Sequence, residues 1–237
     1  MSVADRLVVI AGATSASGLA VTRELLAAGA RVVAIGHDSA KLQQLADALE
    51  TDAASRARDT AGSLRTEVCD LTDETEVAAL TERVHATGGR VDGVLHLVGG
   101  WRGGGGLAGQ TDEDYRFLER ALTALRHVSR AFDDDLRASE SARTAIVSST
   151  AVAHPLAGGA NYAAVKAASE AWARAVAQGF AKAAKESGQP LAAASVIFRT
   201  KSLDGLEEAL AQRFAGLWLT DAAELNDTIV ELTDPSL

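Results

Sequence analysis

Short apolar runs alternate along the chain with longer amphipathic segments. The runs are rich in Val, Ile and Leu, as in RLVVIAG (6–12) and ARVVAIG (30–36), and this composition predicts β-strands. The longer segments have helical length, and one of them follows Asp38 and Ser39, either of which can cap a helix. Strands are expected at 6–12, 30–36, 64–70, 91–99, 142–150, 191–198 and 227–233, and helices at 17–29, 38–50, 72–88, 111–132, 159–187 and near 204–215.

This alternation of strands and helices predicts right-handed βαβ units. The expected fold class is α/β, a doubly wound parallel sheet of about seven strands with helices on both faces, because strands this apolar are buried on both sides. Ligands of such sheets bind beyond the carboxyl ends of the strands, so functional residues are expected in the loops that follow the strands. The polar stretch DAASRARDTAGS (52–63) is expected to be a surface loop.

Composition limits the partners of the chain. It has 237 residues, 47% hydrophobic and 23% charged, and no linker or internal repeat divides it, so one domain over residues 1–237 is expected. A formal net charge of −9 argues against binding to nucleic acid or to an anionic membrane. There is no apolar run of ~18 residues and no signal-peptide pattern, and Cys69 is the single cysteine. A cytoplasmic protein without a disulfide framework or a metal site is expected.

Tyr162 and Lys166 stand four positions apart in NYAAVKAASEAW (161–172), an alanine-rich helical stretch. Side chains at this spacing lie on one helix face. Taken alone, the pair is compatible with an exposed helix whose lysine lies beside a partly buried ring. It is also compatible with a phenol whose acidity is tuned by an ammonium group. Residues elsewhere in the chain decide between these interpretations.

Ser149 ends the predicted fifth strand, thirteen residues before Tyr162. With Lys166, these residues match the serine and the Y-x-x-x-K motif of the short-chain dehydrogenase/reductase family, which the chain resembles over nearly its full length. The resemblance implies a Rossmann-type fold, NAD(P)(H) as the cofactor, and oxidoreductase activity on a small-molecule carbonyl or alcohol. It also implies a homodimer or homotetramer, with the helices at 111–132 and 159–187 in the subunit interface.

The chemistry of carbonyl reduction explains these residue types. Hydride transfer leaves an alkoxide that must be protonated, and a tyrosine with a pKa near ~10 exchanges protons poorly at neutral pH. The Lys166 ammonium is expected to lower the pKa of Tyr162, the acid/base, and by resemblance to donate to the nicotinamide ribose hydroxyls. Ser149 would hold the carbonyl oxygen toward the phenol.

The loop AGATSASG (11–18) follows the first strand and opens a helix. A helix N-terminus offers N–H groups and a positive dipole end to a pyrophosphate, and small residues allow close approach. The family pattern here is T-G-x-x-x-G-x-G, and its middle glycine is replaced by alanine in this chain. The residues expected to contact the cofactor phosphates are Gly12, Thr14, Ala16, Ser17 and Gly18.

Two further strand ends carry cofactor contacts that the resemblance implies. Asp70, in CDLTD, matches a family aspartate at the adenine ring, but it could equally cap the following helix. At the fourth strand, HLVGG stands where the family reads N-N-A-G, so Val98 and Gly99 are expected beside the cofactor. His96 is interpreted as a hydrogen-bonded structural histidine rather than a catalytic one.

The tip of the second strand bears on the choice of dinucleotide. A carboxylate there would accept from a ribose 2′-hydroxyl and select NAD, but Gly36 occupies this position. His37 stands where NADP-using relatives often carry arginine, or it is an ordinary exposed loop residue. The pattern favours NADP(H) over NAD(H), although Asp38, one residue later, could still favour NAD.

Two departures from the family pattern limit the interpretation. Ala121 takes the place of an asparagine that holds a proton-relaying water in many relatives. The usual P-G after the sixth strand is absent, and Thr200 is the residue expected there to meet the cofactor carboxamide. The segment that follows, residues 201–216, is expected to cover the substrate as a lid.

The loop VGGWRGGGG (98–106) resembles the G-G-W-x-G-G stretch of dihydropteridine reductases, a branch of the family that also lacks the asparagine. Trp101 could stack on a planar substrate and Arg102 could attract an anionic one, or the pair could anchor a mobile loop. A pteridine or imine reductase is therefore one alternative. A cofactor-bound sensor that has lost turnover is another, although the intact serine, tyrosine and lysine argue against it.

Overall fold

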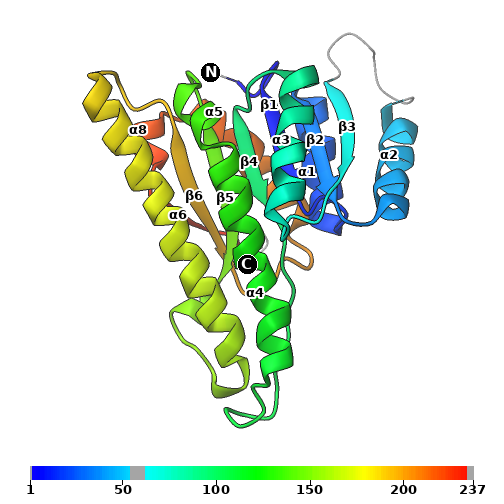
Figure 1. The fold of residues 1–237 in the computed structure, drawn as a ribbon, viewed down its shortest axis with the longest axis vertical. Coiled ribbons are helices and arrows are strands. Elements are labelled where there is room, and N and C mark those ends of the chain that lie inside the picture. The colour runs from blue at the N-terminus through cyan, green and yellow to red at the C-terminus, as the bar shows by residue number, and fades with distance from the viewer. Residues whose placement is uncertain (1, 54–61, 234–237) are drawn as a thin grey trace.

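The computed structural model describes residues 2–53 and 62–233 of the chain (Figure 1). Within these ranges seven strands form one sheet in the order β3-β2-β1-β4-β5-β6-β7, and each neighbouring pair is parallel. The strands are β1 (Leu7–Ala11), β2 (Arg31–Gly36), β3 (Ser63–Val68), β4 (Gly93–His96), β5 (Arg143–Ser149), β6 (Ala194–Thr200) and β7 (Thr228–Glu231).

Helices connect the strands. They are α1 (Ala16–Ala27), α2 (Ser39–Ala53), α3 (Glu74–Gly88), α4 (Asp112–Ala131), α5 (Asp133–Ala138), α6 (Ala160–Ser187), α7 (Glu207–Gly216) and α8 (Ala222–Leu225). The short α5 and α8 are not predicted, because six and four residues are too few to show a helical period. The predicted surface loop at 52–63 lies outside the described residues, apart from the end of α2 and the start of β3.

Six of the seven strands end one to three residues away from the predicted end, and for two of them the neighbouring strand explains the difference. β4 stops at His96 rather than at residue 99, since its partner β1 ends at Ala11. β6 continues to Thr200 rather than stopping at residue 198, since β5 pairs with it as far as Ser149. Strand length in this sheet is therefore set by the neighbouring strand as well as by the apolar run.

Helices cover both faces of the sheet. α1, α2 and α7 supply the core on one face, and α3, α4 and α6 supply it on the other. All five residues of β1 and the last five of β2 are buried, which explains why these strands show no polar alternation. Each fully buried Val, Ile or Leu contributes about 1.5–3 kcal/mol. The predicted doubly wound parallel sheet is confirmed.

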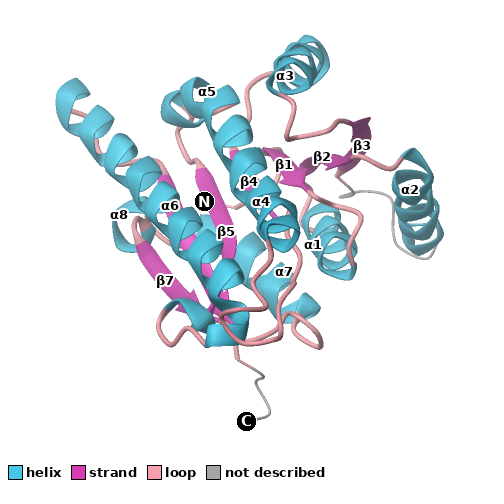
Figure 2. Ribbon diagram, turned by 60° about the horizontal axis from the view of Figure 1, so that its bottom comes forward, coloured by secondary structure: helices cyan, strands magenta, loops and turns pink. Residues whose placement is uncertain are grey.

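The direction of strand order reverses at β1. The chain runs from β1 outward through β2 to β3, and β4 then returns to the other side of β1. The loops that follow β1 and β4 therefore diverge, and a crevice at such a switch point is where ligands of these sheets bind. Figure 2 turns this end of the sheet toward the viewer.

Two long helices, α4 and α6, lie side by side and extend past the carboxyl ends of the strands (Figure 1). α6 has 28 residues and ends at Ser187; the next residue, Gly188, caps it with a φ of 66°, a left-handed conformation that favours glycine. The first turns of α6 lie at the carboxyl ends of the strands and carry Tyr162 and Lys166. Neither α6 nor any other described helix is both long and apolar enough to cross a membrane.

Candidate active site

A cleft of about 940 Å³ opens at the carboxyl ends of β1, β4, β5 and β6. Its walls are the start of α1, the loop after β4, the end of β5 with the turn that follows, the first turns of α6, and the loop after β6. Among the described residues that line it there are two lysines and two histidines but no Asp or Glu. In a chain with a net charge of −9, this local absence of acidic groups favours an anionic ligand.

Ser149, Tyr162 and Lys166 meet in this cleft. Ser149 ends β5, while Tyr162 and Lys166 lie one turn apart on α6. The Lys166 Nζ is 5.8 Å from the centre of the Tyr162 ring and donates to the Val147 carbonyl oxygen at 2.8 Å. Ser149 forms a side-chain hydrogen bond with Tyr162 and also accepts from the Ala151 amide at 3.2 Å. Three residues matched by sequence spacing thus form one cluster across β5 and α6.

The ionisation of this cluster differs from the expectation. Burial raises the pKa of Tyr162 above its ordinary value, and the hydrogen bond with Ser149 opposes that rise only in part. Burial lowers the pKa of Lys166 to about 8, against the opposing effect of the Glu170 carboxylate. The expected lowering of the Tyr162 pKa is therefore wrong for this structure, because desolvation of the phenol outweighs the other influences on it.

The first loop is closely packed around two glycines. Gly12 has a φ of 86°, and a Cβ there would lie 2.8 Å from the Val98 nitrogen. A Cβ at Gly18 would lie 2.1 Å from the Ala13 carbonyl oxygen. Ser15 caps α1 by accepting from the Gly18 amide at 3.1 Å. Gly12 is therefore required by the backbone of the loop after β4, and Gly18 by a backbone contact inside the first loop.

The predicted phosphate contacts divide into two groups in the structure. Ser17 is 6% exposed and lines the cleft, and so does Ser15, which the family pattern does not single out. The other predicted residues do not line the cleft and instead shape the loop that presents these hydroxyls; they are Gly12, Thr14, Ala16 and Gly18. Ala16 is the first residue of α1, so the N-terminus of this helix points to the cleft.

At the tip of β2, Gly36 has no room for a larger side chain. A Cβ there would lie 2.8 Å from Cγ2 of Thr14. His37 follows and is exposed. The Asp38 carboxylate accepts from the amides of Ala40 and Lys41 at 3.0 and 3.1 Å, so it caps α2. The carboxylate that could have favoured NAD is therefore engaged by the helix it precedes.

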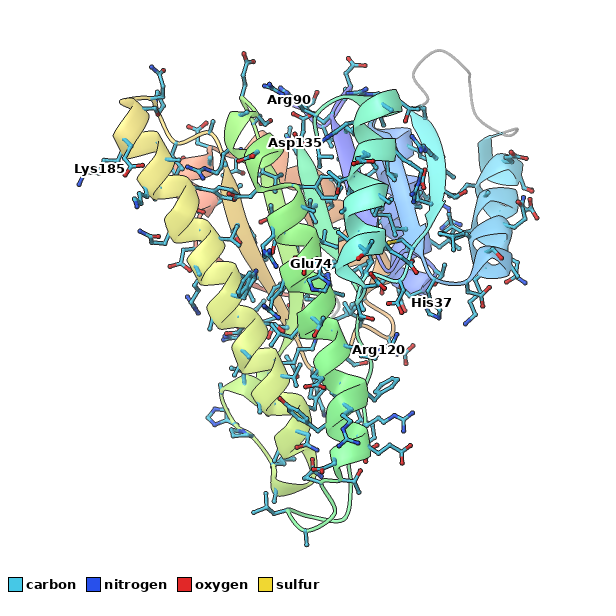
Figure 3. All side chains as sticks on the ribbon, in the orientation of Figure 1. His37, Glu74, Arg90, Arg120, Asp135 and Lys185 are labelled. Atoms are coloured by element: carbon cyan, nitrogen blue, oxygen red, sulfur yellow. The ribbon has the colours of Figure 1, made fainter. Side chains whose placement is uncertain are left out.

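Asp70 does not cap the helix that follows it, because Asp73 does: the Asp73 carboxylate accepts from two amides in the first turn of α3. Asp70 instead accepts from the amide and hydroxyl of Thr72 at 2.9 and 2.6 Å, and these bonds lower its pKa. It also pairs with Arg120 of α4 at 3.3 Å. Figure 3 places Arg120 and His37 near the middle of the long axis of the molecule, whereas Arg90 lies near its upper end. The capping interpretation of Asp70 is wrong, and its proximity to the adenine site stays a prediction.

Only one of the two ring nitrogens of His96 has a hydrogen-bond partner among the described residues. One ring nitrogen, Nε2, lies 3.0 Å from the carbonyl oxygen of Ala121, but Nδ1 is buried without a partner among the described residues. Burial and the nearby Lys166 charge lower the pKa of His96 to about 3, so the ring is neutral. It also lines the cleft. The expectation of a fully hydrogen-bonded structural histidine is therefore wrong, and the ring contacts the residue that replaces the family asparagine.

Val98 and Gly99 follow β4 and line the cleft, as their predicted place beside the cofactor requires. A Cβ at Gly99 would meet a single atom within 4 Å, the Lys166 Nζ at 3.8 Å. The loop after β4 therefore passes directly over the lysine.

Trp101 and Arg102 separate in the structure. Trp101 is 67% exposed and lines the cleft, so it is not a buried anchor. Arg102 lies over the Phe117 ring at 4.2 Å and pairs with Asp114 at 3.4 Å, both on α4. Arg102 is not among the residues that line the cleft, so its charge lies against α4 and the predicted contact with an anionic substrate is not formed in this structure.

The segment at 201–216 is not a lid over its whole length. Residues 201–203 line the cleft, but Leu210 and Phe214 of α7 are fully buried in the core beside α1. Thr200 is buried at the cleft wall, and its hydroxyl donates to the Ser202 carbonyl at 2.8 Å. The apolar spacing of α7 is therefore that of a core helix.

Gln110 is a residue that the sequence pattern misses. Its side-chain nitrogen donates to the carbonyls of Gly104, Gly106 and Gly158 at 3.0–3.3 Å, and its oxygen accepts from the Asn161 amide at 3.1 Å. It thereby joins the glycine-rich loop to the loop that precedes α6. A single amide between two glycine-rich loops leaves no recognisable motif in the sequence.

Comparison with known proteins agrees with the fold described above. The family model described as short chain dehydrogenase matches residues 6–184. The chain is similar to a short-chain type dehydrogenase/reductase from Mycobacterium ulcerans, with 21% identity and a TM-score of 0.83 over 98% of this chain and 90% of that one. No curated protein sequence matches.

Two further solved structures are similar to the chain. One is a metagenomic short-chain oxidoreductase in complex with NADP, with 23% identity and a TM-score of 0.82 over 99% of this chain and 100% of the other. The second is an NADPH-bound short chain oxidoreductase from Pseudomonas aeruginosa PAO1 that contains an atypical catalytic center, with 20% identity and a TM-score of 0.80 over 97% and 96%. At these identities the likeness concerns the fold.

Proposed function

Because the chain belongs to the short-chain dehydrogenase family it is an NAD(P)-dependent oxidoreductase, and we propose that it reduces a carbonyl group of a small molecule, or oxidises the corresponding alcohol. The observation that carries this proposal is the meeting of Ser149, Tyr162 and Lys166 in the cleft at the carboxyl ends of the strands. In this proposal the whole chain, residues 1–237, is one NAD(P)-binding domain.

Tyr162 is the acid/base in this proposal. Burial keeps its phenol protonated at neutral pH, ready to protonate the oxygen that becomes negative when the carbonyl is reduced. Lys166, with a pKa of about 8, is charged at neutral pH and stabilises the phenolate that forms. Ser149 holds the carbonyl oxygen beside the phenol. The bound dinucleotide supplies or accepts the hydride.

The chain fits a dinucleotide at the β1 side of the cleft. The N-terminus of α1 and the hydroxyls of Ser15 and Ser17 line that side and suit a pyrophosphate. Gly99 leaves the backbone bare above Lys166, where a flat ring can approach. Val98, Thr200, Asp70 and His37 complete the proposed contacts. The absence of acidic residues among the described cleft-lining residues supports an anionic cofactor.

We expect NADP(H) to bind more tightly than NAD(H). Thr14 fills the space where a side chain at Gly36 would reach the ribose, and Asp38 is engaged in capping α2. His37 is exposed, and in this proposal it contacts the 2′-phosphate. Fluorescence titration with NADPH and NADH measures both dissociation constants, and we expect a ratio of about tenfold or more, or 1.4 kcal/mol. Tighter binding of NADH would refute the assignment.

The role of Tyr162 is tested with Tyr162→Phe. The variant lacks the proton donor, so we expect carbonyl reduction to fall by at least 10²-fold, in the range of a lost general acid, while NADPH binding changes little. Rates are measured on a panel of ketones, aldehydes and a quinonoid dihydropterin.

The matched control for this test is Tyr115→Phe, since the chain has two tyrosines and Tyr115 lies exposed on α4. The control should keep the wild-type rate. Equal rates from wild type and Tyr162→Phe on every substrate would instead favour a cofactor-bound sensor.

A pteridine or imine reductase is the second candidate function. The observation that favours it is Trp101, which lies 67% exposed at the wall of the cleft, where its ring can stack on a planar substrate. The dihydropterin in the panel separates the two candidates, because this function predicts its reduction in preference to simple ketones.

The proposed assembly is a homodimer or homotetramer through α4 and α6. Two rings on α4, Tyr115 and Phe117, are 43% and 42% exposed on opposite sides of the helix, so each is available to a partner subunit.

A further inference from the structure

The face of α6 that carries Tyr162 and Lys166 continues with Glu170, one turn further along the helix. Glu170 is only 5% exposed. A buried carboxylate needs hydrogen-bonding and charged partners to offset the loss of water. The partners that it has connect it to the proposed active site.

Two neighbouring strands supply these partners. The Ser148 hydroxyl of β5 donates to Glu170 Oε1 at 2.7 Å. The Arg199 guanidinium of β6 forms a forked ion pair, with Nη2 2.9 Å from Oε1 and 2.8 Å from Oε2. Ser148 and Arg199 are direct partners in the pairing of β5 with β6, so the sheet register holds both groups against one carboxylate.

Three consecutive residues of β5 therefore hold three consecutive turns of α6. The Val147 carbonyl accepts from Lys166, the Ser148 side chain donates to Glu170, and Ser149 bonds to Tyr162. The Glu170 carboxylate and its partners therefore lie next to the proposed catalytic cluster, one position away from it on β5 and one helical turn away on α6. A change in the charge of Glu170 therefore acts on Lys166, one helical turn away.

The titratable and charged groups around Lys166 come from three elements. Tyr162 and Glu170 lie one turn before and after it on α6, neutral His96 ends β4, and Arg199 faces Glu170 from β6. Burial lowers the pKa of Lys166 to about 8, and Glu170 is the group that opposes this lowering.

Other charges lie further from Lys166. Arg174 lies 3.9 Å from Glu170 but also pairs with Asp227, and Glu231 lies 3.7 Å from Arg199. Lys201 follows β6 and lines the cleft. Glu170 is therefore the buried carboxylate on α6 that lies nearest to Lys166. Its closest ion-pair partner is Arg199.

We propose that Glu170, held by Ser148 and Arg199, is a positioning residue that keeps Lys166 protonated beside Tyr162. The carboxylate favours the charged form of the lysine, Arg199 limits this effect by sharing the carboxylate, and Ser148 fixes its place. The catalytic meaning of this arrangement rests on the proposed function. The ionisation of Lys166 itself can be measured without substrate or cofactor.

The test is a pH titration by ¹³C NMR with label in the lysine side chains. The chain has five lysines, and the Lys166 resonance is assigned by its loss in Lys166→Met. In the wild type its midpoint is expected near pH 8. Glu170→Gln removes the favourable charge, so the midpoint should fall by about one pH unit. Arg199→Gln removes the competing cation, so the midpoint should rise.

Opposite shifts distinguish charge tuning from simple packing. If the group only packed α6 against β5, either substitution would admit water and raise the midpoint in both variants. The matched control is Glu186→Gln, which breaks an exposed ion pair with Lys182 on the same helix and should leave the Lys166 midpoint unchanged. An unchanged or raised midpoint in Glu170→Gln overturns the proposal.

Circular dichroism shows whether each variant is folded. If Glu170→Gln does not fold, Arg199→Lys takes its place because it keeps the competing cation: the midpoint should rise in Arg199→Gln and stay near the wild-type value in Arg199→Lys. An unchanged or lower midpoint in Arg199→Gln, or an equal rise in both variants, overturns the proposal. Once a substrate is known, the alkaline limb of the pH–rate profile should move with the NMR midpoint in each variant. Should Tyr162→Phe retain full activity while the NMR shifts appear, the proposed function fails and the tuning of Lys166 stands.

Discussion

At the scale of single residues, the environment of a side chain matters more than its type. His96 ends an apolar strand and its sequence context predicts an ordinary buried histidine. In the structure one ring nitrogen meets the Ala121 carbonyl and the other has no partner among the described residues. Its pKa of about 3 is a consequence of that burial, beside the positive charge of Lys166. The protonation of His96 therefore affects the free energy of unfolding of the protein.

His96 is expected to make the protein acid-sensitive. Its folded pKa of about 3 lies below its ordinary value, so below pH 6.5 the unfolded chain binds a proton that the folded chain does not. Stability is then lost as pH falls from 6.5 toward 3, by about 2 kcal/mol at pH 5 from this group. Guanidinium unfolding at pH 7 and pH 5 measures the loss.

The comparison for this prediction is His96→Gln, which cannot titrate and keeps a donor for the Ala121 carbonyl. The variant should lose less stability than the wild type between the two pH values. An equal loss in both proteins would mean that His96 is not the source of the acid sensitivity.

At the scale of elements, short-range signals decide where helices begin. The sequence around α3 offers several residues that can cap a helix, and the structure selects Asp73, whose carboxylate accepts from the Thr75 and Glu76 amides at 2.8 and 3.1 Å. Asp70 is left to bond Thr72 and Arg120. Asp73 caps the helix because it is the residue directly before α3, whereas Asp70 lies three residues earlier, in the turn after β3.

Removal of the Asp73 cap should destabilise the protein. Asp73→Ala leaves two amides of α3 without their acceptor, so the free energy of unfolding should fall by about 1 kcal/mol. Thermal or chemical denaturation measures the change. Asp73→Ser can still cap and should recover most of the loss, and a Ser variant as unstable as the Ala variant would contradict the capping role.

Much of the fold could be predicted from these local patterns. The apolar runs locate all seven strands, and the helical periods locate the six longer helices, because both signals lie within one segment. The exact ends could not be predicted, since β4 and β6 stop where β1 and β5 stop. The order of strands is also a property of the assembled sheet.

The candidate site could be predicted only in part for the same reason. Ser149, Tyr162 and Lys166 can be predicted, because they stand at fixed separations along the sequence. Gln110, Ser148 and Arg199 act through partners more than twenty residues away, and no spacing reports such contacts. The pKa of Tyr162 likewise depends on burial, which the sequence does not state.

At the scale of the whole molecule, charge is distributed unevenly. The chain carries a net charge of −9, while the described residues that line the cleft include Lys166 and Lys201 and no acidic side chain. The acidic side chains of the described residues thus lie outside the lining of the cleft, on the remaining surface and in buried pairs such as Glu170 with Arg199. This division suits a protein that binds a polyanionic small molecule but not nucleic acid.

The alternation of side chains along β6 constrains how this chain can evolve. Ile197 and Arg199 face α6, whereas Phe198 packs toward α1 and α7 and Thr200 lines the cleft. Inserting or deleting one residue within β6 would exchange these faces, bringing a guanidinium into the ligand space and a ring against Glu170. We expect length changes among homologues to be absent from this strand and to gather instead in the loop that follows it.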